Sequence, residues 1–170
     1  RNSTFTAGTE DVEGNIGDIN VTTAATGSYH AISAAPYYSS FIASGNIGNI
    51  TASAVGGAGI DGETFTADSN NDDSGDIGNV TASSVSGYAI NYATFTGANI
   101  GNILATVTGT DGDDAIDDST FTATAGNIGT VTAGTAGDDS DAIDDSIFTA
   151  TGNIGDITAT ASHPNSDDAI

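Results

Sequence analysis

The chain has 170 residues, a formal net charge of -22 at pH 7 and no cysteine. Such an acidic chain disfavours binding to nucleic acids and anionic membranes and instead attracts cations. The absence of cysteine excludes a disulfide-stapled scaffold, and no stretch is long and apolar enough for a membrane span. The length suits one domain, whose many small residues leave few large side chains for a conventional core.

A phrase of the form Asn-Ile-Gly recurs along the chain, with a period of about 27 residues. Its isoleucines, the repeat centres, are Ile16, Ile47, Ile77, Ile100, Ile128 and Ile154. A fixed period of this size is typical of a solenoid, in which each coil covers the core of the next. We therefore expect residues 1–170 to form a single β-solenoid domain of about six coils.

Within each repeat, three segments follow one another. Asn-Ile-Gly leads into a segment such as 157–161 (Ile-Thr-Ala-Thr-Ala), then a variable loop and an Ala-Ile pair, and finally a segment such as 119–123 (Ser-Thr-Phe-Thr-Ala). The segments alternate small or apolar with polar side chains, which is typical of half-buried strands, and none has a helical period. In 119–123, Phe121 and Ala123 should face inward. The pattern predicts an all-β fold, a parallel β-solenoid or roughly triangular β-helix, with three short strands per coil.

Equivalent residues of successive coils should lie side by side. The phenylalanines and the repeat-centre isoleucines should then form internal ladders, the former from Phe5, Phe41, Phe65, Phe95, Phe121 and Phe148. Each Asn-Ile-Gly glycine lies where the chain must bend, and we expect it to adopt a positive φ. Stacked side-chain amides should form a hydrogen-bonded ladder beside it, from Asn15, Asn46, Asp76, Asn99, Asn127 and Asn153.

Aspartates surround the Ala-Ile pairs of the later repeats. Stacked turns should bring their carboxylates close together, where like charges repel unless a cation lies between them. Calcium accepts several carboxylate and carbonyl oxygens, but the chain lacks the calcium-binding nonapeptide of β-rolls and the EF-hand spacing. Two interpretations stay open, a solvated acidic edge or calcium-binding corners. The candidate ligands are Asp111, Asp113, Asp114, Asp117, Asp118, Asp138, Asp139, Asp141, Asp144 and Asp145.

Threonine pairs flank most of the phenylalanines. A flat array of this kind resembles the ice-binding face of β-solenoid antifreeze proteins, but threonine is also favoured at exposed strand positions for structural reasons. Ser40 and Ile42 interrupt the array in one coil. The candidate ice face consists of Thr64, Thr66, Thr94, Thr96, Thr120 and Thr122.

The sequence gives little support to catalysis. His30 and His163 are single and far apart in the coil order, and the paired carboxylates recur as repeat elements instead of marking one site. We therefore expect no enzymatic activity. Glycan or matrix contacts stay open, because Asn-x-Ser/Thr acceptor sequences occur at Asn2, Asn20, Asn49 and Asn79.

The two ends of the chain are in register with each other. The isoleucine of each later Ala-Ile or Gly-Ile pair precedes a phenylalanine by five residues, as with Ile116 and Phe121, and Ile170 placed directly before Arg1 would repeat this spacing at Phe5. We expect the incomplete end coils to need a neighbour, either more of the same polypeptide or another copy. Copies would join head to tail through Arg1, Asn2, Ser3, Thr4, Phe5, Asp168, Ala169 and Ile170.

The phrases Asn-Ile-Gly-x-Ile-Thr-Ala and Thr-Phe-Thr-Ala, strictly or with changes, recur along nearly all of the chain. In them the chain resembles the long Asn/Gly/Thr-rich β-strand-repeat surface and matrix proteins of environmental bacteria. The resemblance implies a secreted or cell-surface structural role, with no catalytic residues to carry over. We predict an extracellular β-solenoid that stacks into a fibre or surface array. An ice-binding protein and a calcium-dependent adhesin stalk are the alternatives.

Overall fold

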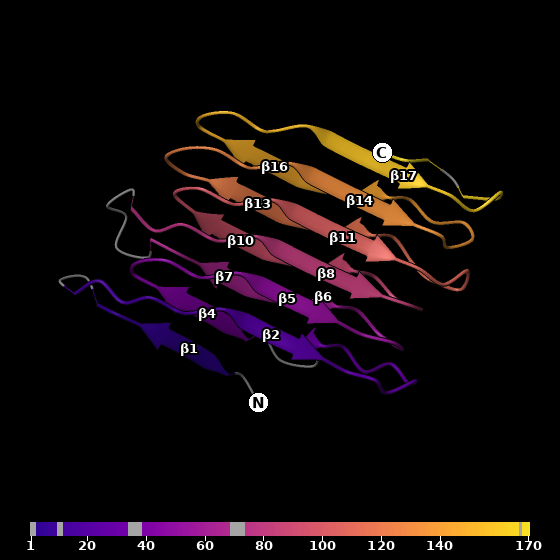
Figure 1. Cartoon of the computed structure of the whole chain (residues 1–170), viewed down its shortest axis with the longest axis horizontal. Coiled ribbons are helices and arrows are strands. Elements are labelled where there is room, and N and C mark those ends of the chain that lie inside the picture. The colour runs from indigo at the N-terminus through magenta and orange to yellow at the C-terminus, as the bar shows by residue number, and fades with distance from the viewer. Residues whose placement is uncertain (1–2, 10–11, 34–38, 69–73, 167) are drawn as a thin grey trace.

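The computed structural model describes residues 3–9, 12–33, 39–68, 74–166 and 168–170. Every regular element in these ranges is a β-strand, which confirms the predicted all-β class. The same residues contain no helix able to cross a membrane. Figure 1 shows the strands stacked in chain order, from the N-terminal coil to the C-terminal coil.

Successive coils contribute their strands to three parallel sheets, two of six strands and one of five. The Phe sheet has the order β1 (Thr4–Ala7), β4 (Ser40–Ala43), β7 (Thr64–Thr66), β10 (Thr94–Gly97), β13 (Thr120–Ala123) and β16 (Ile147–Ala150). The Ala sheet has the order β2 (Ile19–Thr22), β5 (Ile50–Ser53), β8 (Val80–Ser84), β11 (Ile103–Val107), β14 (Val131–Thr135) and β17 (Ile157–Ala161). The short sheet has the order β3 (Ile32–Ser33), β6 (Ile60–Asp61), β9 (Ile90–Asn91), β12 (Ile116–Asp117) and β15 (Ile143–Asp144).

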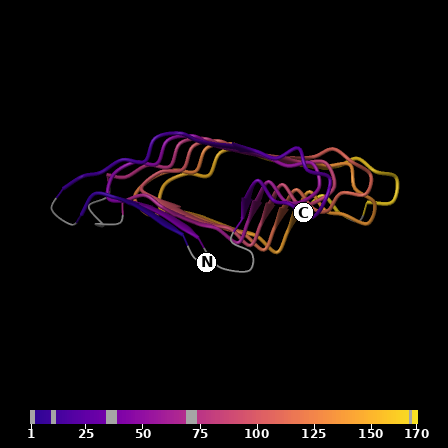
Figure 2. The same cartoon turned by 90° about the horizontal axis from the view of Figure 1, so that it is seen from below.

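This topology confirms the predicted parallel β-solenoid with three short strands per coil. Sheet neighbours come from successive coils, and equivalent residues are register partners, as with Phe95 and Phe121. Figure 2 looks along the stack, where the coils superimpose in an elongated outline that is flatter than an equilateral triangle. The alternation of side chains is also as predicted: Phe121 and Ala123 are buried, whereas Thr120 and Thr122 on the same strand are half-buried.

The core contains ladders of like side chains, two of which consist of a single residue type. Neighbouring phenylalanine rings are stacked, with centroids 4.8–5.0 Å apart and interplanar angles of 2–7°. The strand spacing sets this distance. The repeat-centre isoleucines pair in parallel bridges from Ile16 through to Ile154. Both predicted internal ladders are therefore confirmed.

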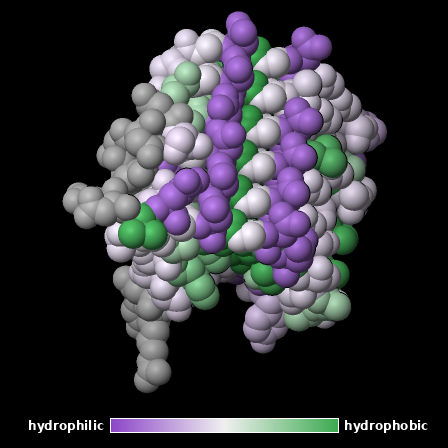
Figure 3. All heavy atoms as spheres, turned by 60° about the vertical axis from the view of Figure 1, so that its left-hand side comes forward, coloured by the Kyte–Doolittle hydropathy of each residue, from purple (hydrophilic) through white to green (hydrophobic). Residues whose placement is uncertain are grey.

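The corner between the Phe and Ala sheets carries two polar ladders. In the predicted one, the backbone N–H of Asn46 donates to Asn15 Oδ1 at 2.6 Å, and the same bond recurs in the following coils at 2.8–3.1 Å. Each side-chain oxygen thus accepts mainly from the backbone of the next coil. A second, unpredicted ladder runs through Asp18, Asn49, Asn79, Asn102 and Thr130 at 2.8–3.0 Å. Figure 3 shows two hydrophilic columns on either side of a pale column.

The corner glycines do not adopt the predicted positive φ. Among the described glycines only Gly8 and Gly62 do so. The prediction was wrong because close contact between coils, and not backbone conformation, requires glycine here. A Cβ on Gly78 would lie 2.8 Å from the carbonyl carbon of Gly48, and the later corners show the same approach. At the first corner, Gly17, a Cβ would have nothing within 4 Å.

Candidate functional site

The short sheet carries a row of polar side chains on the face opposite its isoleucines, and two members of the row, Asn91 and Asp117, are buried. The first residue of each strand is a buried isoleucine, and the second belongs to this row. The row consists of Ser33, Asp61, Asn91, Asp117 and Asp144, which are register partners in successive strands. Stacking therefore places one acidic or amide side chain directly next to another.

The residue after each of the last four row members adopts a left-handed backbone conformation. Tyr92, Asp118 and Asp145 have φ values of 49°, 45° and 39°, and Gly62 occupies the equivalent position with 72°. Aspartate tolerates this left-handed conformation better than most residues. The second aspartate of each Ile-Asp-Asp sequence therefore has a local structural reason to be present, independent of any metal.

Three of the ten candidate calcium ligands come together. Asp114, Asp117 and Asp144 each offer a carboxylate oxygen, and these oxygens lie within 4.8 Å of one another. Asp114 belongs to the loop before β12, and its Oδ1 accepts the backbone N–H of Asp141 at 2.6 Å. Asp141 Oδ1 in turn accepts the N–H of Asp168 at 2.5 Å. The loop carboxylates thus form a ladder similar to those at the glycine corner.

The other candidate ligands lie outside this group of three. Asp138 Oδ1 is 3.2 Å from His163 Nδ1, and Asp141 belongs to the loop ladder described above. The remaining ones are Asp111, Asp113, Asp118, Asp139 and Asp145.

Burial, and then the negative charge of neighbouring carboxylates, raises the pKa values in this group. The pKa of the Asp117 carboxyl is raised to about 6, chiefly by burial and then by the negative charges of Asp118, Asp114 and Asp144. Burial also raises the pKa of Asp114, against the opposing effect of the hydrogen bond from Asp141. The charged forms are therefore poorly solvated, which is the environment in which a cation gains most.

Asn91 is a residue that the sequence reasoning missed. Its side chain is only 8 % exposed, and its Nδ2 donates to Asp61 Oδ1 at 3.0 Å. Its Oδ1 is buried and has no hydrogen-bond partner. The available signal was its position, because Asn91 follows an Ala-Ile pair where two later repeats have aspartate.

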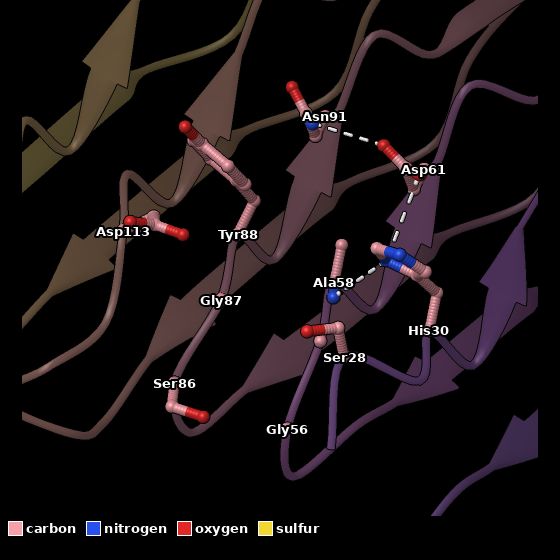
Figure 4. A pocket seen from close by; sticks show the side chains of 11 residues that line it. Ser28, His30, Gly56, Ala58, Asp61, Ser86, Gly87, Tyr88, Asn91 and Asp113 are labelled. Atoms are coloured by element: carbon pink, nitrogen blue, oxygen red, sulfur yellow. Dashed lines mark hydrogen bonds and ion pairs between the residues drawn. The ribbon is translucent and has the colours of Figure 1, made fainter. Parts of the chain in front are cut away.

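An open pocket of about 310 Å³ adjoins this row. Figure 4 shows its polar lining, which includes Ser28, His30, Asp61, Tyr88, Asn91 and Asp113. His30 Nδ1 accepts the N–H of Ala58 at 3.0 Å and lies 3.7 Å from Asp61 Oδ2. A neutral His30 therefore carries its proton on Nε2, so the pair lacks the Nδ1–H to carboxylate bond of a catalytic dyad.

Tyr88 lines this pocket and is also influenced by the charges of the nearby aspartates. The pKa of its hydroxyl is raised to about 12 by burial and by the charges of Asp113, Asp117 and Asp114.

Glu63 is a second buried acid without a counter-charge nearby. It lies before β7, is 1 % exposed, and its Oε2 has no hydrogen-bond partner. Burial, and then the charge of Asp61, raises its pKa to about 7.

The candidate ice face is in register over three coils. Thr94 pairs with Thr64 and Thr120, and Thr96 pairs with Thr66 and Thr122. The array is interrupted on both sides. On one side Ser40 and Ile42 are the partners, and on the other Ile147 pairs with Thr120.

The candidate assembly residues lie on the two end coils, except that Arg1 and Asn2 are outside the described residues. Ser3, Thr4 and Phe5 are exposed, and Phe5, a member of the phenylalanine ladder, is 54 % exposed. At the other end Asp168, Ala169 and Ile170 are exposed. The N–H of Ile143 donates to the carbonyl of Ala169 at 3.2 Å, which extends the short sheet by one further rung.

The acceptor sequences for glycosylation are divided between the corner and a strand. Asn49 and Asn79 belong to the second corner ladder, and Asn20 is exposed on β2. Asn2 lies outside the described residues.

Comparison of the chain with models of known protein families, with curated proteins and with solved structures finds no match.

Proposed function

We propose that the chain is a structural β-solenoid unit that stacks head to tail on copies of itself, forming an extracellular fibre or cell-surface array. The exposed core residues of the end coils carry this proposal. Phe5 is 54 % and Ile157 is 44 % exposed, whereas Phe95 and Ile103 in the same two ladders are buried. Burial of such apolar surface stabilises an assembly by about 25 cal/mol per Å² before the costs of association.

The hydrogen-bonding groups of the two end coils are complementary. Each corner oxygen accepts from the coil that follows it, so the last coil offers Asn153 Oδ1 as an acceptor and the first offers the N–H of Asn15 as a donor. Ala169 already lies beside β15. The Ile-to-Phe spacing of five residues would then bring Phe5 of a second copy beside Phe148. Contacts between two different surfaces of this kind generate open filaments.

The test uses Gly17→Ala. A Cβ at this position meets nothing within 4 Å in the single chain, so the variant should fold normally. In a stack, however, Gly17 would face Gly155 of the preceding copy, just as each internal corner glycine faces the corner glycine of the coil before it. There a Cβ lies 2.8–2.9 Å from the backbone of the preceding corner glycine, a distance that real Cβ atoms do not tolerate.

We expect the wild-type chain to form filaments or long oligomers by electron microscopy and light scattering, and Gly17→Ala to remain monomeric. Gly134→Ala is the matched control, since its Cβ makes only an ordinary contact at 3.8 Å. It should assemble like the wild type. Wild-type particles that stay monodisperse in all salt and calcium concentrations would contradict the proposal. Assembly of Gly17→Ala at wild-type levels would contradict it equally.

The location and the adhesin alternative have their own tests. A surface location predicts that antibodies against the chain label intact cells of its source, and labelling only after permeabilisation would contradict it. A calcium-dependent adhesin stalk would share the stacking, but its assembly would disappear with a calcium chelator. Because each copy carries a net charge of -22, assembly should also increase with ionic strength.

Ice binding is the second candidate function, favoured by the register of the threonines. The rows of Thr64, Thr94 and Thr120 and of Thr66, Thr96 and Thr122 repeat at the strand spacing, about 4.8 Å. Thr96→Tyr should then abolish thermal hysteresis, whereas Thr81→Tyr on the Ala sheet should not. Absence of thermal hysteresis and ice shaping in the wild-type chain would exclude this function.

A further inference from the structure

We propose that the carboxylates of Asp114, Asp117 and Asp144, together with the side-chain oxygen of Asn91, bind one calcium ion at the short sheet. This site lies on the short sheet and in the loop before β12, whereas the Gly17→Ala test of the stacking concerns the corner between the Phe and Ala sheets. It would hold three successive coils together, through β9, β12 and β15.

The spacing of the carboxylates suits a single ion. One oxygen from each lies within 4.8 Å of the other two. Calcium–oxygen bonds of about 2.3–2.6 Å place opposite ligands about 4.6–5.2 Å apart, so the three oxygens can reach the same ion. The hydrogen bond from the N–H of Asp141 holds Asp114 in this position.

Asn91 provides an independent indication of a ligand. Strand β9 lies between β6 and β12, and the Nδ2 of Asn91 donates toward β6, to Asp61. Its oxygen is on the other side of the amide, away from Asp61 in Figure 4. Asp117 is the register partner of Asn91 on that side. Because the Nδ2 is bonded to β6, the oxygen is left on the side of β12, and a buried amide oxygen without a partner is unfavourable unless a cation satisfies it.

The donor set identifies the kind of ion. All four ligands are carboxylate or amide oxygens, which hard cations prefer, whereas zinc and copper favour nitrogen and sulfur. Magnesium requires a near-ideal octahedral arrangement, while calcium accepts an irregular one. Ligands that come from three separate coils fit the irregular arrangement that calcium accepts.

The experiment measures calcium binding to the full chain by isothermal titration calorimetry, after chelator treatment and at an ionic strength that screens diffuse attraction. We expect one ion per chain. Asp117→Asn and Asp144→Asn should each weaken binding by at least about tenfold, the loss that even outer partners of metal sites show. Both variants should fold, because asparagine already occupies this row at Asn91. Asp145→Asn is the matched control, since it removes the same charge one residue away.

A second variant separates coordination from general charge. Asn91→Ala leaves the net charge unchanged, so a diffuse acidic edge would bind calcium as before, whereas the proposed site would bind it at least about tenfold more weakly. Circular dichroism should show that the variant is folded before its affinity is compared. No binding at millimolar calcium, equal effects of Asp144→Asn and Asp145→Asn, or an unchanged affinity of Asn91→Ala would each overturn the proposal. None of these results bears on the stacking, which Gly17→Ala tests separately.

Discussion

Replacing Glu63 with glutamine should stabilise the fold in a strongly pH-dependent way. The carboxyl of Glu63 has a pKa of about 7 in the fold and 4.5 as its ordinary value. Below pH 4.5 both the folded and the unfolded chain carry the proton, and stability is fully present. As the pH rises toward 7 only the unfolded chain releases the proton, so stability falls. Above pH 7 the loss is complete, at about 3 kcal/mol.

A glutamine at position 63 does not ionise, so this loss should disappear. We expect Glu63→Gln to exceed the wild type by about 1 kcal/mol at pH 5 and by about 3 kcal/mol at pH 8.5. For a chain of this length the second value corresponds to an increase in Tm of about 6–12 °C. Urea denaturation followed by circular dichroism at both pH values measures the difference.

Glu13→Gln is the control, because Glu13 is exposed. It should change the free energy of unfolding by less than about 0.5 kcal/mol at either pH. The reasoning would be refuted if Glu63→Gln gained no more stability at pH 8.5 than at pH 5, or no more than Glu13→Gln. Either result would mean that Glu63 ionises in the fold as readily as in the unfolded chain.

Three further predictions concern the ladders and the metal. Phe95→Ala should lower the free energy of unfolding by about 3–5 kcal/mol in urea denaturation, because the ring is fully buried between two others; a loss below about 1 kcal/mol would contradict this packing. Gly78→Ala should lower it by about 1–3 kcal/mol, because its Cβ meets the backbone of Gly48, whereas Gly17→Ala should be nearly neutral in the monomer; equal effects would contradict the glycine interpretation. Millimolar calcium should raise the Tm of the wild type, with a smaller rise in Asp144→Asn because this variant binds calcium more weakly.

Most of the fold could be predicted because the same strand pattern recurs in successive coils. The alternation around Phe121 predicts one strand, and three other coils repeat its Thr-Phe-Thr sequence, which makes a chance match improbable. The stacking of phenylalanine on phenylalanine then follows from a parallel solenoid alone. The corner glycines show where such reasoning ends. The recurrence of Gly78 and its equivalents indicates that glycine is required at the corner. Only the three-dimensional structure shows that the reason is close contact between coils and not a positive φ.

The candidate site was less predictable because it depends on loops that differ between coils. The sequence does not distinguish between the ten candidate aspartates. Only the folded loops determine that Asp114 lies close to Asp117 and Asp144. The role of Asn91 could not be predicted for a different reason. Its unpartnered oxygen results from the direction in which its amide is held by Asp61, and that direction depends on the neighbouring coil. Burial of Glu63 likewise comes from packing and not from its own segment.

The one-way hydrogen bonding of the corner ladders has a consequence for growth kinetics. In a fibre built from this solenoid the two tips would be chemically different, since one exposes Asn153 Oδ1 and the other the N–H of Asn15. A Gly17→Ala chain could still add through its unaltered last coil, but no further chain could add to its blocked first coil. It would therefore act as a chain terminator at one tip only, and small amounts mixed with the wild type would shorten fibres without lowering the number of nuclei.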